Sequence, residues 1–337
     1  MNPDTDAISF GKRITDGALR AQYTSVTVAA RGSPPHGCRI ILPKSAIRAS
    51  NVESQPIRKG LLSLVAGFQV TPTVLVQVLG TVIEFEVNLV DWLGFEMERR
   101  GAKIEALRAS VDANGQVVHA NVQGPGPTRG RVAIKSNGPN VILLAGQMPE
   151  DAAAGPVEIL GLAAASLDLT SPLHQRLMEP LVKHEDPKAH FSFLYPKSWS
   201  ATSLAPPSPQ IGAVEIRVAS KTDTLAYIRV HSDASIAPGE VGRERIKNQL
   251  IAQIEGAGVK ISSLEALAPL PEKGALTRFA GEAKLPKGDA LVAVAIQPAK
   301  EGWMGAMLIS PGRGMNPLAW MRAKRAFEIV TASLSST

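Results

Sequence analysis

The chain has 337 residues, of which 45 % are apolar and 20 % charged, a balance typical of folded globular proteins and unlike that of disordered chains. Its net charge of +6 is spread along the sequence without a block of Lys or Arg, so the composition does not indicate a nucleic-acid-binding surface. The single cysteine, Cys38, excludes an intramolecular disulfide and is expected to pack as a small apolar side chain.

The N-terminal segment contains Asp4, Asp6 and Asp16, where a secretory signal would have a basic start and an apolar run, so the chain is predicted to stay in the cytoplasm. Residues 60–83 then contain no charged side chain, and by length they could span a membrane. Pro72 between two threonines and the alternation "TVLVQV" instead favour two strands joined at "TPT". No direct membrane span is therefore expected.

One phrase occurs twice, as "LPKSAIRAS" from Leu42 and as "YPKSWSATS" from Tyr195. Further matches follow in the same order: "ERRGAKIEAL" with "EGAGVKISSL", "VAIKSNGPNVILLAGQMP" with "VAIQPAKEGWMGAMLISP", and "GPVEIL" with "NPLAWM". The offset between the matched segments varies only between 153 and 162 residues, which predicts a tandem duplication. The expected parts are an N-terminal arm (1–35), a first copy (36–170), a linker (171–188) and a second copy (189–337).

The second copy gives the clearer order of elements. Strands are predicted at 191–195, 212–218, 224–232, 259–264, 276–283, 290–297 and 304–310. A helix begins near Pro238, with Val241, Ile246, Leu250 and Ile254 on one face. A second helix, capped by Asn316, is predicted to bury Leu318, Met321, Phe327, Val330 and Leu334. In the first copy, "VNLVDWLGFEMERRG" corresponds to the first helix, with Leu89, Leu93 and Met97 inward. The pattern predicts an α+β fold made of two tandem repeats, each an antiparallel β-sheet packed with helices.

The second copy resembles the PsbP-like and DcrB-like superfamily of small α/β/α sandwich domains. The resemblance rests on a strand ending in "YPKSWS", the helix "ERIKNQLIAQIEGAGVKI" and the terminal "AKRAFEIVTASL", with matches at Pro196, Trp199, Ile329, Ser333 and Leu334. The first copy departs from the pattern because Ala46 stands at the tryptophan position. The resemblance implies binding rather than catalysis. One similar cytoplasmic branch, the Eag-type chaperones, holds apolar helices of type VI secretion effectors.

The sequence contains no familiar catalytic or metal-binding motif. His184 and His190 are six residues apart in the predicted linker, and the histidines form no metal pair of familiar spacing. "GPGPTRGR" has prolines where a phosphate loop needs backbone donors, and neither G-x-S-x-G nor H-E-x-x-H occurs. No enzyme activity, cofactor or metal is therefore expected.

These observations predict an adaptor or chaperone that shields apolar or transmembrane segments of a protein client with its sheet faces. The predicted contacts share one side of a strand in each copy: Phe68, Val74, Val76 and Val78 in the first, and Ala226, Ile228 and Val230 in the second. The same strands also fit burial on both faces. Two other functions remain open, a structural subunit of an envelope or secretion complex and an enzyme with an unrecognised site. The repeat also leaves open whether the copies pack as an intramolecular pseudo-dimer.

Overall fold

The structure, a computed structural model, divides into two compact units. The first unit comprises Met1–Glu84 and Asn88–Met178, and the second comprises Phe85–Val87 and Glu179–Thr337. The residues that it describes are 17, 21–30, 33–49, 55–112, 115–152, 154–170, 177–186, 191–205, 208, 210–219, 224–268 and 275–336.

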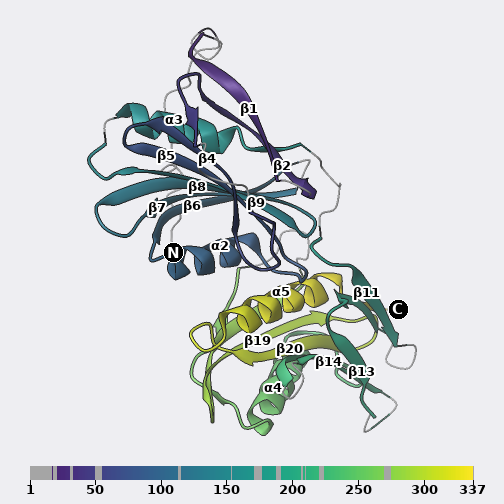
Figure 1. The fold of residues 1–337 in the computed structure, drawn as a ribbon. Helices are drawn as coiled ribbons and strands as arrows, with labels where there is room; N and C mark the ends of the chain where they lie inside the picture. The colour runs from purple at the N-terminus through teal and green to yellow at the C-terminus, as the bar shows by residue number, and fades with distance from the viewer. Residues whose placement is uncertain are drawn as a thin grey trace. The chain divides into compact units, whose positions relative to one another are not determined.

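The first unit is built on a seven-stranded antiparallel sheet in the order β3-β4-β5-β9-β8-β7-β6 (Figure 1). Its strands are β3 (Ile47–Arg48), β4 (Ser63–Thr71), β5 (Val74–Val82), β6 (Lys103–Asp112), β7 (Gly115–Gln123), β8 (Thr128–Asn137) and β9 (Asn140–Pro149). A smaller sheet consists of β1 (Tyr23–Ala30), β2 (Ser33–Pro43) and β10 (Asp168–Leu169). Helices α2 (Leu89–Arg99) and α3 (Ala154–Ala165) lie on opposite faces of the large sheet.

The first core lies between the large sheet and a layer made of α3 and the small sheet. Its buried members include Leu160 from α3, Ile40 from β2 and Leu144 from β9. Cys38 on β2 is fully buried in the same cluster, as predicted, and burial raises the pKa of its thiol to about 12.

Helix α2 contacts β6 and β7 on the other face of the sheet. It begins after Asn88, whose side-chain oxygen accepts a hydrogen bond from the Val90 backbone nitrogen at 2.9 Å. Leu89, Leu93 and Met97 are buried, as their spacing predicts.

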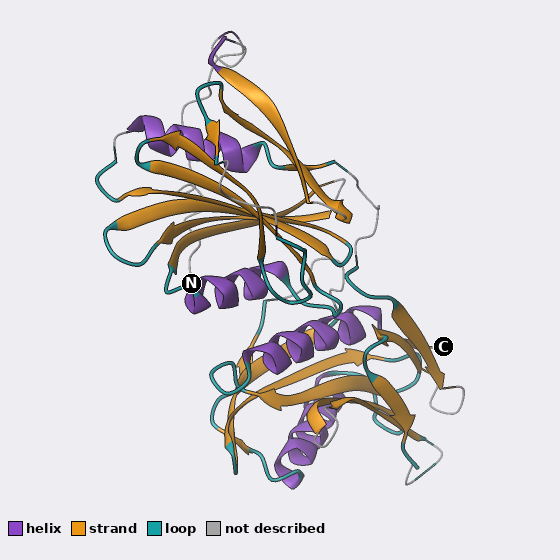
Figure 2. Ribbon diagram, viewed as in Figure 1, coloured by secondary structure: helices purple, strands orange, loops and turns teal. Residues whose placement is uncertain are grey.

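The second unit repeats this arrangement, with the large sheet in the order β13-β14-β15-β20-β19-β18-β16 and β17 also paired with β18. These strands are β13 (Ser200–Ser203), β14 (Ile211–Ala219), β15 (Thr224–Asp233), β16 (Lys260–Ile261), β17 (Glu265–Ala266), β18 (Thr277–Leu285), β19 (Gly288–Pro298) and β20 (Trp303–Pro311). The small sheet is formed by β11 (Leu181–Asp186), β12 (Phe191–Pro196) and β21 (Ser335–Ser336). Helix α5 (Pro317–Ser333) joins β12 in one core, and α4 (Glu240–Gly256) packs over β19 and β20 in another (Figure 2).

The two large sheets have the same connectivity. In each, a hairpin is followed by a helix, then by the remaining strands, and a second helix follows the last long strand. The predicted α+β class and the tandem repeat of helix-packed antiparallel sheets are therefore confirmed.

The uncharged stretch 60–83 contains β4 and β5, which are joined by a tight turn at Pro72. In the described part of the chain, none of the helices has the length and apolar character needed to cross a bilayer. The small sheet of each unit uses a strand from a segment predicted to lie outside the two copies: β1 falls in the predicted arm 1–35 and β11 in the predicted linker 171–188.

Two side chains predicted to face inward are exposed, Val241 at 85 % and Leu318 at 42 %. Both lie in the first turn of a helix. In α4 the neighbouring Gly242 is buried instead. The backbone there lies so close to the Ala237 carbonyl oxygen and to Trp303 Nε1 that a Cβ atom would collide with both. The close approach of this turn thus turns Val241 toward solvent.

Candidate functional site

The predicted client contacts of the first unit lie in its core. Phe68 of β4 and Val74, Val76 and Val78 of β5 are between 0 and 3 % exposed. They belong to the cluster formed with α3 and β2, which cover this face of the sheet. The prediction that these side chains form an open apolar face is corrected, because the third layer buries them in the free protein.

The same correction applies to the second unit. Ala226, Ile228 and Val230 of β15 are between 0 and 3 % exposed and pack in the cluster that contains α5 and β12. In both units the apolar side of these strands is therefore covered by a helix and a small sheet of the same unit.

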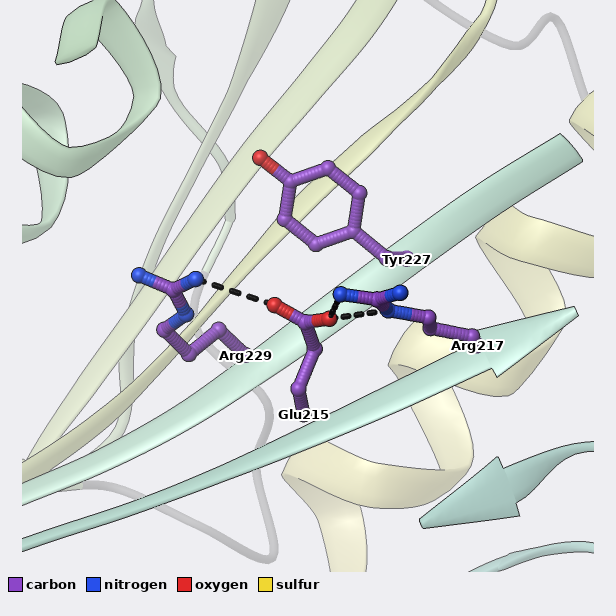
Figure 3. Close-up of a pocket in the computed structure, with 4 residues that line it drawn as sticks. All are labelled: Glu215, Arg217, Tyr227 and Arg229. Atoms are coloured by element: carbon purple, nitrogen blue, oxygen red, sulfur yellow. Dashed lines mark hydrogen bonds and ion pairs between the residues drawn. The ribbon is translucent and has the colours of Figure 1, made fainter. Parts of the chain in front are cut away.

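The other face of β14 and β15 carries a cluster of polar side chains that line a cavity (Figure 3). Glu215 and Arg217 alternate along β14, and Tyr227 and Arg229 alternate along β15. The antiparallel register pairs Glu215 with Arg229 and Arg217 with Tyr227, so all four side chains emerge on one face. Because Val214, Ile216, Ile228 and Val230 occupy the intervening positions, the apolar core fixes where this cluster stands.

A buried carboxylate lies at the centre of the cluster. Arg229 Nη2 donates to Glu215 Oε2 at 2.9 Å, and both Nε and Nη2 of Arg217 contact Glu215 Oε1. The Glu215 side chain is 5 % exposed, whereas those of Arg229 and Arg217 are 29 % and 55 % exposed. Figure 3 shows the two guanidinium groups on either side of the carboxylate, with the Tyr227 ring above it.

The ionisation of the cluster follows from this geometry. Burial by itself opposes ionisation of Glu215, but the hydrogen bonds from Arg229 and Arg217 outweigh it and hold the pKa of the carboxyl below its usual range. Burial raises the pKa of Tyr227, and the tyrosine packs against the core beneath α4. At neutral pH the four residues therefore carry one carboxylate, two guanidinium groups and one neutral phenol.

The cavity measures about 300 Å³ and is lined by these four residues. Both carboxylate oxygens of Glu215 are engaged by arginines, and the pKa of the Tyr227 phenol is raised further above 7. Neither group is therefore suited to exchange protons near pH 7. The arrangement can bind and orient a ligand through charge and hydrogen bonds. Across the residues described, no three His, Cys, Asp or Glu side chains gather so as to hold a metal ion.

His231 is the next residue of β15 on the same face, beyond Arg229. It is 7 % exposed, and its Nε2 has no hydrogen-bond partner within the described part of the chain. Burial lowers its pKa, outweighing the nearby Asp233 carboxylate, which raises it. The imidazole is therefore neutral at pH 7 and adds no charge beside Arg229.

A second ionisable cluster lies on β7 and β8 of the first unit. Burial, followed by the positive charges of Arg131, Arg108 and Lys135, lowers the pKa of His119 to about 4. Lys135 Nζ donates to Asp168 Oδ1 at 3.1 Å, which ties β8 to β10. This ion pair joins the large sheet to the small one, so we interpret the cluster as part of the unit's architecture.

Of the histidine pair noted in the sequence, His184 stacks on Phe193 with ring centroids 5.1 Å apart. His190 lies outside the described residues.

Sequence reasoning did not single out the Glu215 cluster. The signal was present as E-x-R at Glu215 and Y-x-R at Tyr227, two alternating polar pairs on strands that the sequence did predict. Only the register of the hairpin shows that the two pairs face each other.

Comparison with known proteins finds no matching family model and no matching curated sequence. Among solved structures, the chain is similar to the cyanobacterial PsbP protein CyanoP of Synechocystis sp. PCC 6803, at 16 % identity and a TM-score of 0.31, over 47 % of this chain and 92 % of that one. It is also similar to the T6SS immunity protein TplEi of Pseudomonas aeruginosa, at 13 % identity and a TM-score of 0.26, over 93 % and 97 % of the chains. A third similarity is to the Tle4–Tli4 complex, at 12 % identity and a TM-score of 0.24, over 93 % and 97 %.

Proposed function

We propose that this chain is a non-catalytic, cytoplasmic protein-binding adaptor and that the face of β14 and β15 around Glu215 holds its client. The observation that carries the proposal is the cluster itself: a buried carboxylate fixed between two arginines, with a tyrosine beside them, at a cavity of about 300 Å³. The lowered pKa of Glu215 and the raised pKa of Tyr227 both lie further from 7 than usual, which supports binding rather than acid–base catalysis.

The size and lining of the cavity support a protein partner. Sites for small molecules usually enclose the ligand in a mainly apolar pocket of roughly 300–1,000 Å³. This cavity is at the lower end of that range, and three of its four lining side chains are charged, with Arg217 more than half exposed. Arginine and tyrosine are enriched among the residues that contribute most to protein interfaces. The site therefore suits one side chain presented by a protein surface.

The finer part of the proposal concerns the client, a type VI secretion effector with apolar segments. It is supported by the resemblance of the second copy to the PsbP-like and DcrB-like superfamily at Pro196, Trp199 and Leu334, a superfamily with the Eag-type chaperones as a similar cytoplasmic branch. Since the apolar faces of both large sheets are covered, shielding of an apolar segment would require a covering layer to move. We propose that the polar cluster makes the first contact.

The test is affinity purification of the tagged chain from its own host cells, followed by binding of the purified candidate client. Arg217→Gln removes the positive charge of the most exposed residue of the cluster, and Tyr227→Phe removes only the phenol hydroxyl. Arg245→Gln, on the exposed side of α4, removes the same charge away from the cavity and serves as the matched control.

The proposal expects a secreted client whose purified form binds wild type and Arg245→Gln alike, binds Arg217→Gln at least tenfold more weakly and binds Tyr227→Phe several-fold more weakly. A purified client that binds all four proteins equally would overturn the assignment of the site. Recovery of a set of apparatus subunits, unaffected by the variants, would instead indicate a structural subunit. Turnover of a substrate that depends on Glu215 would contradict a non-catalytic role.

A further inference from the structure

We infer that the group received by the cavity is a single carboxylate, the side chain of an Asp or Glu on the protein partner, bound by Arg217, Arg229 and Tyr227. This inference rests on the proposed function for the class of partner. The chemistry of the ligand follows separately from the donors, the charge and the exposure of the cluster.

The cluster has more hydrogen-bond donors than acceptors. Two guanidinium groups carry about ten N–H donors and the phenol one more, whereas a carboxylate offers about four acceptor positions. Glu215 engages only Nε and Nη2 of Arg217 and Nη2 of Arg229. Within the described part of the chain, Arg229 Nε is buried without a hydrogen-bond partner. A ligand that fits such a site brings acceptors.

The charge of the cavity fixes how much negative charge the ligand should carry. Glu215 cancels one of the two arginines, and neutral His231 adds nothing, so the four lining residues carry a net charge of +1. Asp233, the next residue after His231 on this face of β15, is not among the four residues that line the cavity. Its Oδ1 accepts a hydrogen bond from the backbone nitrogen of Ser235 at 2.9 Å. A monoanionic carboxylate matches the remaining charge, whereas a phosphate dianion would exceed it.

Exposure shows where the ligand enters. Arg217 is 55 % exposed and Arg229 is 29 % exposed, while Glu215 between them is 5 % exposed. In Figure 3 one terminal guanidinium nitrogen of each arginine points away from Glu215. Glu215 therefore acts as a positioning residue that holds both arginines in place. A carboxylate approaching from solvent meets Arg217 first.

The test uses three short peptides as probes and observes the Nε–Hε resonances of arginine by NMR in the full chain. The first is acetyl-Gly-Glu-Gly-amide, which has one internal carboxylate. The second is acetyl-Gly-Gln-Gly-amide, its neutral counterpart of the same shape. The third is acetyl-Gly-Gln-Gly with a free C-terminal carboxylate, and inorganic phosphate is titrated in parallel.

The inference expects saturable shifts at Arg217 and Arg229 with the internal-Glu peptide, at least tenfold weaker binding to Arg217→Gln, and no saturation at the exposed Arg245. Tyr227→Phe keeps the fold and is expected to weaken binding several-fold. Equal response to the Gln peptide, preference for the free C-terminus, or tighter binding of phosphate would each overturn the assignment.

The two proposals fail in different ways. If the Glu peptide binds but the purified client ignores the cluster variants, the carboxylate site stands and the proposed function fails. If the client requires the cluster but the peptide does not bind, the function stands and the carboxylate assignment fails.

Discussion

Truncation of Ile228 is expected to destabilise the second unit strongly, because the structure places this side chain in the core. Ile228 is fully buried and packs in the cluster that contains Trp199 and Phe327. Replacement by alanine removes three carbon groups, worth about 2.5 kcal/mol in transfer free energy at about 0.8 kcal/mol each. A residual cavity of roughly 80 Å³ adds about 2 kcal/mol. Ile228→Ala is therefore expected to lower the free energy of unfolding by about 4 kcal/mol.

Urea denaturation followed by tryptophan fluorescence measures this loss, since Trp199 is buried in the same cluster. The midpoint should fall without a change in the slope of the transition. Val241→Ala, at a position 85 % exposed in the same unit, is the control and should change stability by less than about 0.5 kcal/mol. Equal and small effects of the two substitutions would refute the core assignment and restore the open-face interpretation of β15.

Three further outcomes follow from local geometry. Asn316→Ala should lower stability by about 1 kcal/mol in urea denaturation, because the Asn316 side chain caps α5 by accepting from the Ala319 nitrogen at 3.1 Å; an unchanged midpoint would contradict the cap. Gly305→Ala should destabilise the protein by about 1–3 kcal/mol, because a Cβ atom there would lie 2.7 Å from the Ala295 carbonyl oxygen and 2.8 Å from Leu250 Cδ1. A thermal melt of the variant measures this loss, and an unchanged Tm would contradict the close contact. The pKa of His119 is about 4 in the folded state and about 6.5 in the unfolded state, so the unfolded state binds the proton first as the pH falls. Stability should therefore be highest above about pH 6.5 and should fall as the pH drops from about 7 to 4. His119→Gln should flatten that part of the pH profile, and an identical profile would show that His119 titrates normally.

Periodicity predicted most of the elements because strands and helices impose different repeats on apolar residues. The alternation in β5 and β15 and the spacing of Leu89, Leu93 and Met97 in α2 all correspond to buried faces. The internal repeat then ordered these elements into two sheets of equal connectivity.

Periodicity could not identify the layer that covers each apolar face. That layer includes β1 and β11, which come from segments that the repeat left outside both copies. An apolar strand face has the same sequence pattern whether it is covered by distant strands or open to a client. Val76 and Ile228 were therefore correctly placed on one side of a strand, but the pattern could not show that this side is buried.

The candidate site depends on register, which the alternation within a single strand does not fix. Glu215 and Arg229 meet only because β14 and β15 pair as they do across their hairpin, and a shift of one residue would separate them. The register also explains why Arg217 stands opposite Tyr227.

The most direct test of the central claim is a double-mutant cycle between Arg217 and the carboxylate of the purified client, with dissociation constants measured for wild type, Arg217→Gln, the neutralised client and the pair. A direct ion pair at this cavity predicts that each single change weakens binding about tenfold and that the double change weakens it little further, giving a coupling energy of at least about 1 kcal/mol. Additive losses for every acidic residue of the client would contradict the account.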